Sequence, residues 1–207
     1  MAVQQIISPI DGSVVAEREL ASDSVVDAVL AAAQAAQTVW RATAIAERIR
    51  LCEAMIAHLE ASVADIATEI SWQMGRPVRY TPNEILRGAQ ERARYMMSIA
   101  TEELADVSVP PVDGFTKYIE RTPVGTVLIV APWNYPYLTA INSLIPALLA
   151  GNTVIMKHAS QTLLCAERFT EACTAAGFPA GVFQHVHASH SAVERMIQDP
   201  RVNFVVF

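Results

Sequence analysis

The stretch TPVGTVLIVAPWNYPYLTAINSLIPALLAGNTVIMKHAS, residues 122–160, contains two apolar runs, one ending in Pro132-Trp133-Asn134 and the other in Lys157. Continuous apolar runs of this length are typical of strands buried on both faces of a sheet. Asn134 and Lys157 each fall where such a strand stops, and ligands of open α/β sheets bind at the carboxyl edge of the strands. The stretch therefore predicts an α/β fold with a binding site at that edge.

Strand and helix patterns alternate through the second half of the chain, with short connections between them. Strands are expected at residues 126–130, 153–157, 182–186 and 202–207, and helices at residues 138–150, 161–176 and 191–198. This alternation predicts right-handed βαβ units and a parallel sheet with flanking helices.

The first half of the chain is predicted to form a hairpin followed by helices. A hairpin is expected over residues 6–20, because Asp11-Gly12 is a strong signal for a two-residue turn. Apolar residues at helical spacing then predict three helices, which cover residues 25–40, a longer segment from 52 that ends near Gly75, and residues 84–100.

The composition indicates a globular protein with a small-molecule partner. A chain of 207 residues with 52% hydrophobic content can bury a full core. Its 15 basic residues stand against 21 acidic ones, which gives a net charge of -6. Binding to nucleic-acid phosphates needs clustered Lys and Arg, so no nucleic-acid partner is expected.

An uncharged segment between Arg121 and Lys157 raises the question of a membrane span. Pro and Asn recur there too often for a lipid-facing helix, so no membrane association is expected. The start of the chain, MAVQQIISPIDG, has no basic segment followed by an apolar core, so no secretory signal is visible. We therefore expect a cytoplasmic protein.

The three cysteines, Cys52, Cys165 and Cys173, lie within helical patterns and show no CxxC spacing. Buried, reduced thiols are the expected state. No neighbouring His or Lys in the sequence gives a reason to regard one of them as an activated nucleophile.

Asn134 and Lys157 are the sharpest candidates for chemistry. The amide of Asn134 has two donors, and Pro132 and Pro136 stiffen the turn around it, so it can hold a developing oxyanion without reorganising. An Asn that bonds its own turn is the alternative. The ammonium of Lys157 can reach a ribose hydroxyl or a phosphate of a dinucleotide, whereas a Lys lying along the surface is the alternative.

His185 and His187 share a strand face, with His190 nearby, and three imidazoles can in principle hold a metal ion. No Cys or carboxylate in the sequence around them completes a ligand set. We therefore predict no metal site. The phosphate-binding motifs G-x-G-x-x-G and G-x-x-x-x-G-K-[ST] are also absent from the sequence.

Four motifs, TPVG, APWNYP, PALLAGNTVIMK and AAGFPAGVF, stand in an order and spacing that resemble the aldehyde dehydrogenase superfamily, as do SPIDGSVVAE and WQMGRP nearer the N-terminus. The resemblance covers nearly the whole chain. It implies a Rossmann-like NAD(P)-binding core over residues 122–207, preceded by an N-terminal hairpin and helices over residues 1–113 that belong to the same cofactor-binding domain.

Between these parts, Pro110, Pro111 and Gly114 end the helical series, and FTKYIER, residues 115–121, alternates enough to form a strand. In the family, the segment 114–121 belongs to a small bridging sheet used in oligomerisation, so the resemblance implies a dimer or tetramer for the full-length protein. The partner of this strand is expected from a part of the family's sequence that lies beyond Phe207.

The resemblance implies NAD(P)-dependent oxidation of an aldehyde, such as a semialdehyde, to a carboxylic acid through a Cys thiohemiacetal. The chain stops at Phe207, before the Gly-Ser turn, the general-base Glu and the nucleophilic Cys of the family. We therefore expect this chain alone to be inactive and to self-associate through open strand edges. A non-catalytic binding or assembly protein with the same fold, or a reductase of acyl phosphates or acyl-CoA, is the alternative.

The resemblance also implies roles for particular residues. Asn134 donates to the thiohemiacetal oxygen, and Tyr137 either faces the substrate tunnel or simply begins a helix. The residues implied in binding the cofactor are Val130, Ala131, Pro132, Trp133, Lys157 and Ser160.

Two positions depart from the family's pattern. Ser160 stands where NAD-preferring relatives often carry a Glu that holds the two ribose hydroxyls. Because a carboxylate repels a 2′-phosphate and a hydroxyl does not, NADP should be tolerated beside NAD. Ala188 stands where many relatives have Gly, and its methyl group narrows the approach of the adenine.

Overall fold

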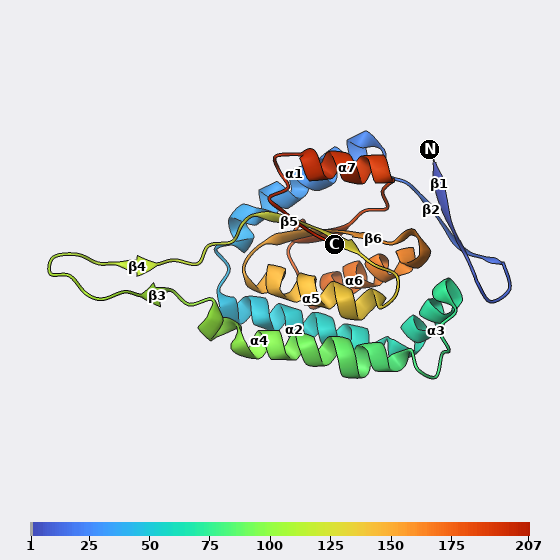
Figure 1. The fold of residues 1–207 in the computed structure, drawn as a ribbon, viewed down its shortest axis with the longest axis horizontal. Coiled ribbons are helices and arrows are strands. Elements are labelled where there is room, and N and C mark those ends of the chain that lie inside the picture. The colour runs from blue at the N-terminus through green and yellow to red at the C-terminus, as the bar shows by residue number, and fades with distance from the viewer. Residues whose placement is uncertain (1) are drawn as a thin grey trace.

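A four-stranded parallel sheet lies at the centre of the structure, a computed structural model that describes residues 2–207 (Figure 1). The sheet has the order β7-β6-β5-β8, in which the strands are β5 (Thr126–Ala131), β6 (Thr153–His158), β7 (Phe183–His185) and β8 (Phe204–Val206). The predicted parallel α/β sheet is confirmed, although β7 and β8 are shorter than the sequence pattern suggests.

Helices cover both faces of this sheet (Figure 1). One face carries α1 (Asp23–Trp40) and α7 (His190–Gln198), and the other carries α5 (Pro136–Leu149) and α6 (Leu163–Ala176). Leu128 and Ile155 pack among the apolar residues of α1 and α7, whereas Ile129 and Met156 pack in the larger core on the opposite side. Burial on both faces explains why these strands are continuously apolar.

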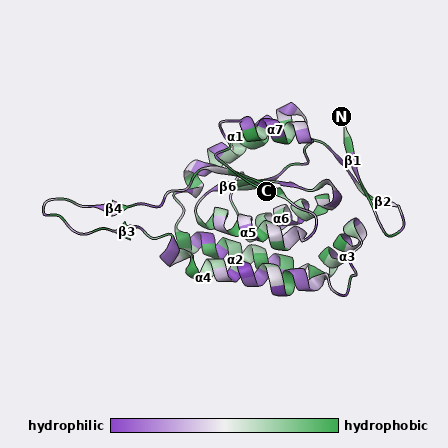
Figure 2. Cartoon of the chain, viewed as in Figure 1, coloured by the Kyte–Doolittle hydropathy of each residue, from purple (hydrophilic) through white to green (hydrophobic). Residues whose placement is uncertain are grey.

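A further layer of helices packs on α5 and α6. It consists of α2 (Ile45–Ala61), α3 (Val63–Met74) and α4 (Gln90–Glu103), with the π-helical segment η1 (Glu84–Ala89) before α4. Figure 2 shows hydrophilic and hydrophobic residues side by side along α2 and α4, as in amphipathic helices that pack on a core. The single long second helix predicted from the sequence is wrong, because the chain breaks at Ser62 between α2 and α3. The break leaves the apolar stripe intact, so the pattern does not reveal it.

The N-terminal hairpin pairs β1 (Val3–Ile7) with β2 (Val14–Glu19) in antiparallel register. Its turn is longer than the predicted two-residue turn, since the backbone N–H of Ser8 donates to the carbonyl of Ser13 at 2.8 Å. Gly12 adopts a φ of 75°, and Asp11 accepts a hydrogen bond from the N–H of Ser13. The residues of the predicted turn therefore lie inside a six-residue loop, 8–13, rather than forming the whole connection.

A two-stranded arm extends from the body of the protein (Figure 1). In it, β3 (Val107–Ser108) pairs in antiparallel fashion with β4 (Tyr118–Ile119). The expectation that residues 115–121 lack a partner within this chain is therefore wrong. Strands of two residues on either side of Pro110 and Pro111 are too short for a period-two pattern to reveal the pairing.

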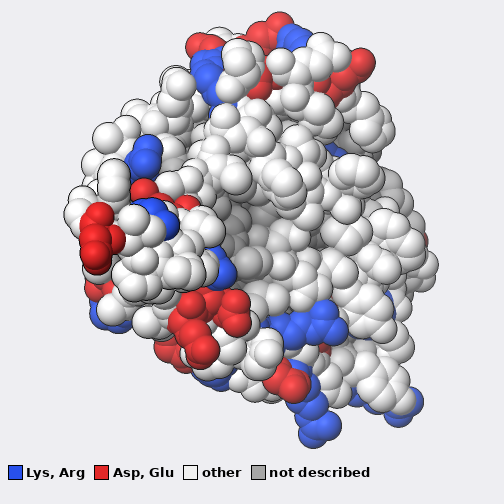
Figure 3. All heavy atoms as spheres, turned by 60° about the vertical axis from the view of Figure 1, so that its left-hand side comes forward, with Lys and Arg blue, Asp and Glu red and all other residues white. Residues whose placement is uncertain are grey.

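Acidic and basic side chains are interspersed over the face shown in Figure 3, and they surround a hollow lined mainly by uncharged residues. This face has no continuous basic surface of the kind that binds a phosphate backbone. Across residues 2–207, the helices are too short or too polar to traverse a lipid bilayer.

Candidate functional site

The carboxyl ends of β5 and β6 bring the two candidate segments to one edge of the sheet. Val130 pairs with Lys157 and Ala131 pairs with His158. After these pairs, the segment that follows β5 continues through residues 132–135 into α5. The segment that follows β6 continues into the 3₁₀-helix η2 (Ser160–Thr162). The predicted meeting of the two segments at a carboxyl edge is confirmed.

Residues 132–135 form an exposed loop at this edge. Asn134 is exposed, and 55% of the surface of Trp133 is open to solvent. Pro132 is exposed as well, whereas Val130 is half-buried and Ala131 is buried in the strand. The Asn134 amide and the Trp133 indole are therefore free to meet a ligand from outside.

The Lys157 side chain lies on the face of β6 that also carries Ile155, the side covered by α1 and α7. Only 8% of this residue is exposed, and burial lowers the pKa of its ammonium. Within residues 2–207 no carboxylate forms an ion pair with it. Ser160, two residues after the strand, is exposed at the start of η2.

His158 is a buried link between the two segments that the sequence pattern does not indicate. Its Nδ1 accepts a hydrogen bond from the N–H of Ala159 at 3.1 Å and lies 2.9 Å from Oγ1 of Thr162. The proton is therefore on Nε2, which donates to the carbonyl of Pro136 at 3.1 Å. Burial lowers the pKa of His158 to about 4, so the ring is neutral and joins the end of β6 to the first turn of α5.

An ion pair from the outer helical layer holds the other side of the Asn134 loop. Arg76 binds Glu84, whose side chain is 1% exposed, and also donates to the backbone carbonyl of Asn134 at 2.6 Å. Glu84 Oε1 accepts from the N–H groups of Tyr137 and Leu138 at 2.8 and 3.1 Å. Glu84 thus caps α5, whose own N-cap residue makes no side-chain capping bond.

Sequence reasoning missed this pair, although signals for it exist. Arg76 lies in the WQMGRP motif, and Glu84 opens the third predicted helix. Neither the WQMGRP motif nor the helical spacing shows that Arg76 and Glu84 contact residues 134–138, more than fifty positions further along the chain. Only the packing of η1 against α5 brings them there.

Residues 2–207 match the model of the Aldehyde dehydrogenase family. The chain belongs to this family. A curated relative, "Succinate-semialdehyde dehydrogenase [NADP(+)]" of Mycobacterium avium (strain 104), is 37% identical over 199 residues, which cover 95% of this chain and 42% of the relative. The chain therefore spans less than half the length of such aldehyde dehydrogenases.

Solved structures give the same result for the fold. Succinic semialdehyde dehydrogenase from Streptococcus pyogenes, in complex with NADP+, matches with a TM-score of 0.89 and 26% identity over 98% of this chain and 44% of that one. PnpE in complex with nicotinamide adenine dinucleotide matches with a TM-score of 0.91 and 30% identity over 99% of this chain and 42% of that one. The chain thus has the fold of the N-terminal portion of an aldehyde dehydrogenase.

The three cysteines of this aldehyde dehydrogenase chain are buried, as predicted. Burial raises the pKa of Cys52 to about 12 and also raises the pKa values of Cys165 and Cys173 above the usual value of a thiol. Because the thiolate is the nucleophilic form, none of these thiols is suited to attack an aldehyde.

Tyr137 is also part of the core. It is 1% exposed, and its ring centroid lies 5.1 Å from that of Phe169 in α6. Burial raises the pKa of its hydroxyl well above the usual value. Of the two sequence-based alternatives, this position is the one expected of a residue that begins a helix and packs inward.

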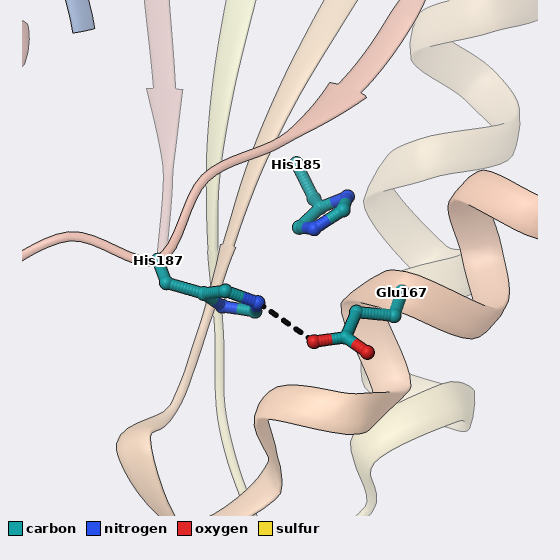
Figure 4. Close-up of side chains that lie close together, drawn as sticks. All are labelled: Glu167, His185 and His187. Atoms are coloured by element: carbon teal, nitrogen blue, oxygen red, sulfur yellow. Dashed lines mark hydrogen bonds and ion pairs between the residues drawn. The ribbon is translucent and has the colours of Figure 1, made fainter. Parts of the chain in front are cut away.

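A second group of polar side chains lies along α6 and the end of β7 (Figure 4). Glu167 Oε1 is 2.9 Å from Nε2 of His187, and Arg18 of β2 binds both carboxylate oxygens of Glu167 at 2.6 and 2.8 Å. The rings of His185 and His187 lie 5.0 Å apart. His190, the third member of the predicted histidine group, instead opens α7 and is exposed.

The charges in this group are well defined. Burial opposes ionisation of Glu167, but the hydrogen bonds from His187 and Arg18 outweigh it and lower the pKa of the carboxyl to about 2. Burial lowers the pKa of His185, so its ring is neutral near pH 7. The sequence pattern singled out the two histidines and missed Glu167, because the carboxylate comes from the preceding helix, 20 positions before His187.

Proposed function

We propose that this chain is the cofactor-binding part of an enzyme that oxidises a semialdehyde to a carboxylic acid with NADP or NAD. The observation that carries the proposal is the placement of Asn134 and Lys157 on adjoining strand ends at one edge of the sheet. The curated relative at 37% identity, named as an NADP-dependent succinate-semialdehyde dehydrogenase, supports both the substrate class and the cofactor.

The residues at the edge fit a nicotinamide dinucleotide, which accepts a hydride when it is bound. Lys157 offers an ammonium without a carboxylate partner in residues 2–207, and burial of the side chain strengthens its attraction to a phosphate or ribose oxygen. The hydroxyl of Ser160 leaves room for a 2′-phosphate and brings no negative charge. Trp133 supplies an exposed aromatic ring on the loop after β5.

In the proposed reaction the side-chain amide of Asn134 donates a hydrogen bond to the aldehyde oxygen as that oxygen gains negative charge. His158 and the Arg76–Glu84 pair fix the loop around it from both sides, so little reorganisation is needed. The nucleophile and the general base of the family are proposed to come from outside this chain, because the thiols of residues 2–207 are buried and protonated. We propose that this chain alone does not oxidise aldehydes.

The exposed arm is proposed to serve assembly. Several large apolar side chains lie open to solvent on and between β3 and β4, among them Val112, Phe115, Tyr118 and Ile119. Exposed apolar groups on an arm that leaves the body of the protein are typical of contacts between subunits. We propose a homo-oligomer on this basis.

Calorimetric titration of the purified chain with NADP+ and with NAD+ tests the cofactor proposal. Lys157→Met should weaken binding of both by about tenfold or more, since it removes a charge-assisted bond. The matched control is Lys117→Met, in which the other lysine of the chain, exposed on the arm, is replaced. Equal effects of the two substitutions, or no binding by the folded chain, would contradict the proposal.

The enzymatic part is tested on the gene product that contains this sequence, with a short-chain semialdehyde as substrate and reduced cofactor as readout. Turnover by that product and none by residues 1–207 is the expected result. A product that binds NADP but oxidises no aldehyde would favour the alternative of a non-catalytic binding protein.

A further inference from the structure

Glu167, His185 and His187 bring one donor atom each to a single place. These three atoms all lie within 4.8 Å of one another, and they come from α6, β7 and the residues that follow β7. Figure 4 shows the carboxylate and the His187 ring directed toward each other, with the His185 ring above them. The sequence-based prediction of no metal site rested on the lack of a carboxylate, and the fold supplies one.

Thr170 fixes the tautomer of His185. Its hydroxyl donates to the carbonyl of Ala166 at 3.0 Å and lies 2.6 Å from Nδ1 of His185. A hydroxyl has one hydrogen, so Nδ1 must be the donor in the second contact. The lone pair of His185 is therefore on Nε2, which is the arrangement of a neutral imidazole whose other nitrogen is anchored, as in protein metal sites.

His187 has a nitrogen that its surroundings leave unsatisfied. The side chain is 10% exposed, and Nδ1 is buried without a hydrogen-bond partner among residues 2–207. Nε2 lies 2.9 Å from Glu167 Oε1. Two ligand atoms at about 2.1 Å from one tetrahedral ion lie about 3.4 Å apart, so a displacement of about half an ångström would admit an ion between them. The proton that Nε2 shares with the carboxylate would then move to the unpartnered Nδ1.

Arg18 acts against a cation here, but it does not block the carboxylate. The guanidinium takes one lone pair from each oxygen of Glu167. The second lone pair of Oε1 faces Nε2 of His187, and Oε2 keeps a second one. The guanidinium holds the carboxylate in place and in its charged form. Its positive charge also repels an incoming metal ion, so affinity should rise when that charge is removed.

We propose that Glu167, His185 and His187 form a binding site for a divalent transition-metal ion such as Zn²⁺. Two imidazoles and one carboxylate suit Zn²⁺ or Co²⁺ rather than Mg²⁺ or Ca²⁺. A cavity of about 250 Å³ is lined in part by His185 and His187. The ion would join α6 to the end of β7.

The test uses the purified chain, stripped of metal with a chelator and titrated with Zn²⁺ and with Co²⁺. One equivalent should bind, Co²⁺ should develop the visible absorption of a low-symmetry site, and Zn²⁺ should raise the melting temperature. His187→Gln and Glu167→Gln should each lower Zn²⁺ affinity tenfold or more. Arg18→Gln should raise it, and the matched control His190→Gln should leave it unchanged.

Histidine ring resonances in NMR keep the test decisive if a variant fails to fold. In the unaltered chain, Zn²⁺ should shift the ring signals of His185 and His187 and not those of His58 or His190. Unshifted His185 and His187 signals, or an equal loss of affinity in His190→Gln and His187→Gln, would overturn the proposal. So would a folded Arg18→Gln chain that binds Zn²⁺ no better than the original.

Discussion

The Arg76 guanidinium joins the buried carboxylate of Glu84 to the backbone carbonyl of Asn134. Through these two contacts, the segment after α3 and the start of η1 set the position of a loop at the carboxyl edge of the sheet. The Glu84 carboxylate also accepts hydrogen bonds from two backbone N–H groups in the first turn of α5. The ion pair therefore holds Asn134 and the first turn of α5, which follows it.

Arg76→Met should destabilise the fold more than Glu84→Gln does. The first change leaves the Glu84 carboxylate buried without a counter-charge, which costs about 3 to 5 kcal/mol. The second removes the charge but keeps an acceptor for Tyr137 and Leu138, so a loss of about 1 to 2 kcal/mol is expected. Urea denaturation measures both free energies of unfolding. Arg79→Met is the control, and a loss in Arg76→Met no larger than in this control would contradict the role of the pair.

Asn134→Ala should lower the turnover of the enzyme that contains this chain by roughly a hundredfold or more, because an amide aimed at a developing oxyanion contributes most in the transition state. Affinity for the cofactor should change little. Steady-state kinetics with pre-steady-state measurement of the chemical step checks this. The exposed Asn83→Ala is the matched control, and an unaltered chemical step in Asn134→Ala would refute the assignment.

Ser160→Glu should weaken the binding of NADP more than that of NAD, because the new carboxylate repels the 2′-phosphate. Ser160→Gln has nearly the same size without the charge and separates repulsion from crowding. Titration of both cofactors against the three proteins gives the result. If Glu and Gln at this position weaken NADP binding equally, the selectivity does not come from charge.

His158 should make the fold sensitive to mild acid. The pKa of its ring is about 4 in the folded chain and about 6.5 when unfolded. The unfolded chain therefore binds the proton first, so stability is complete above pH 6.5 and falls as the pH drops from 6.5 toward 4, by about 3 kcal/mol in total.

Chemical denaturation at several pH values from 7 to 4 measures this loss. His158→Gln should be less stable at pH 7 and should show a flatter dependence on pH, whereas the exposed His190→Gln should follow the original chain. Parallel curves for the original chain and His158→Gln would show that another group dominates in this range.

The sequence predicts the parallel sheet and its binding edge because both depend on local patterns. Continuous apolar runs reflect burial on both faces of β5 and β6, and Asn134 and Lys157 lie within a few residues of the strand ends. The pairing of β3 with β4, by contrast, involves only two residues in each strand, and no periodicity can show it. The break at Ser62 has neither Gly nor Pro to mark it.

The supporting residues of the site could not be predicted for a different reason. His158 lies inside a stretch that reads as the end of a strand, and its function depends on the carbonyl of Pro136 being within reach. Glu167 belongs to an amphipathic helix, where a carboxylate ordinarily faces solvent. Contacts between residues far apart in sequence decide both roles, and such contacts follow from packing rather than from residue type.

The strand order also has a consequence for how the chain folds. β5 lies between β6 and β8, and the amide of Thr126 donates to the side chain of Asn203, 77 positions later, at 2.8 Å. One edge of the central strand therefore stays unpaired until nearly all of these residues have left the ribosome. Closure over such a sequence separation is entropically costly and slow, so the docking of β8 beside β5 should be slower than the pairing of β5 with β6.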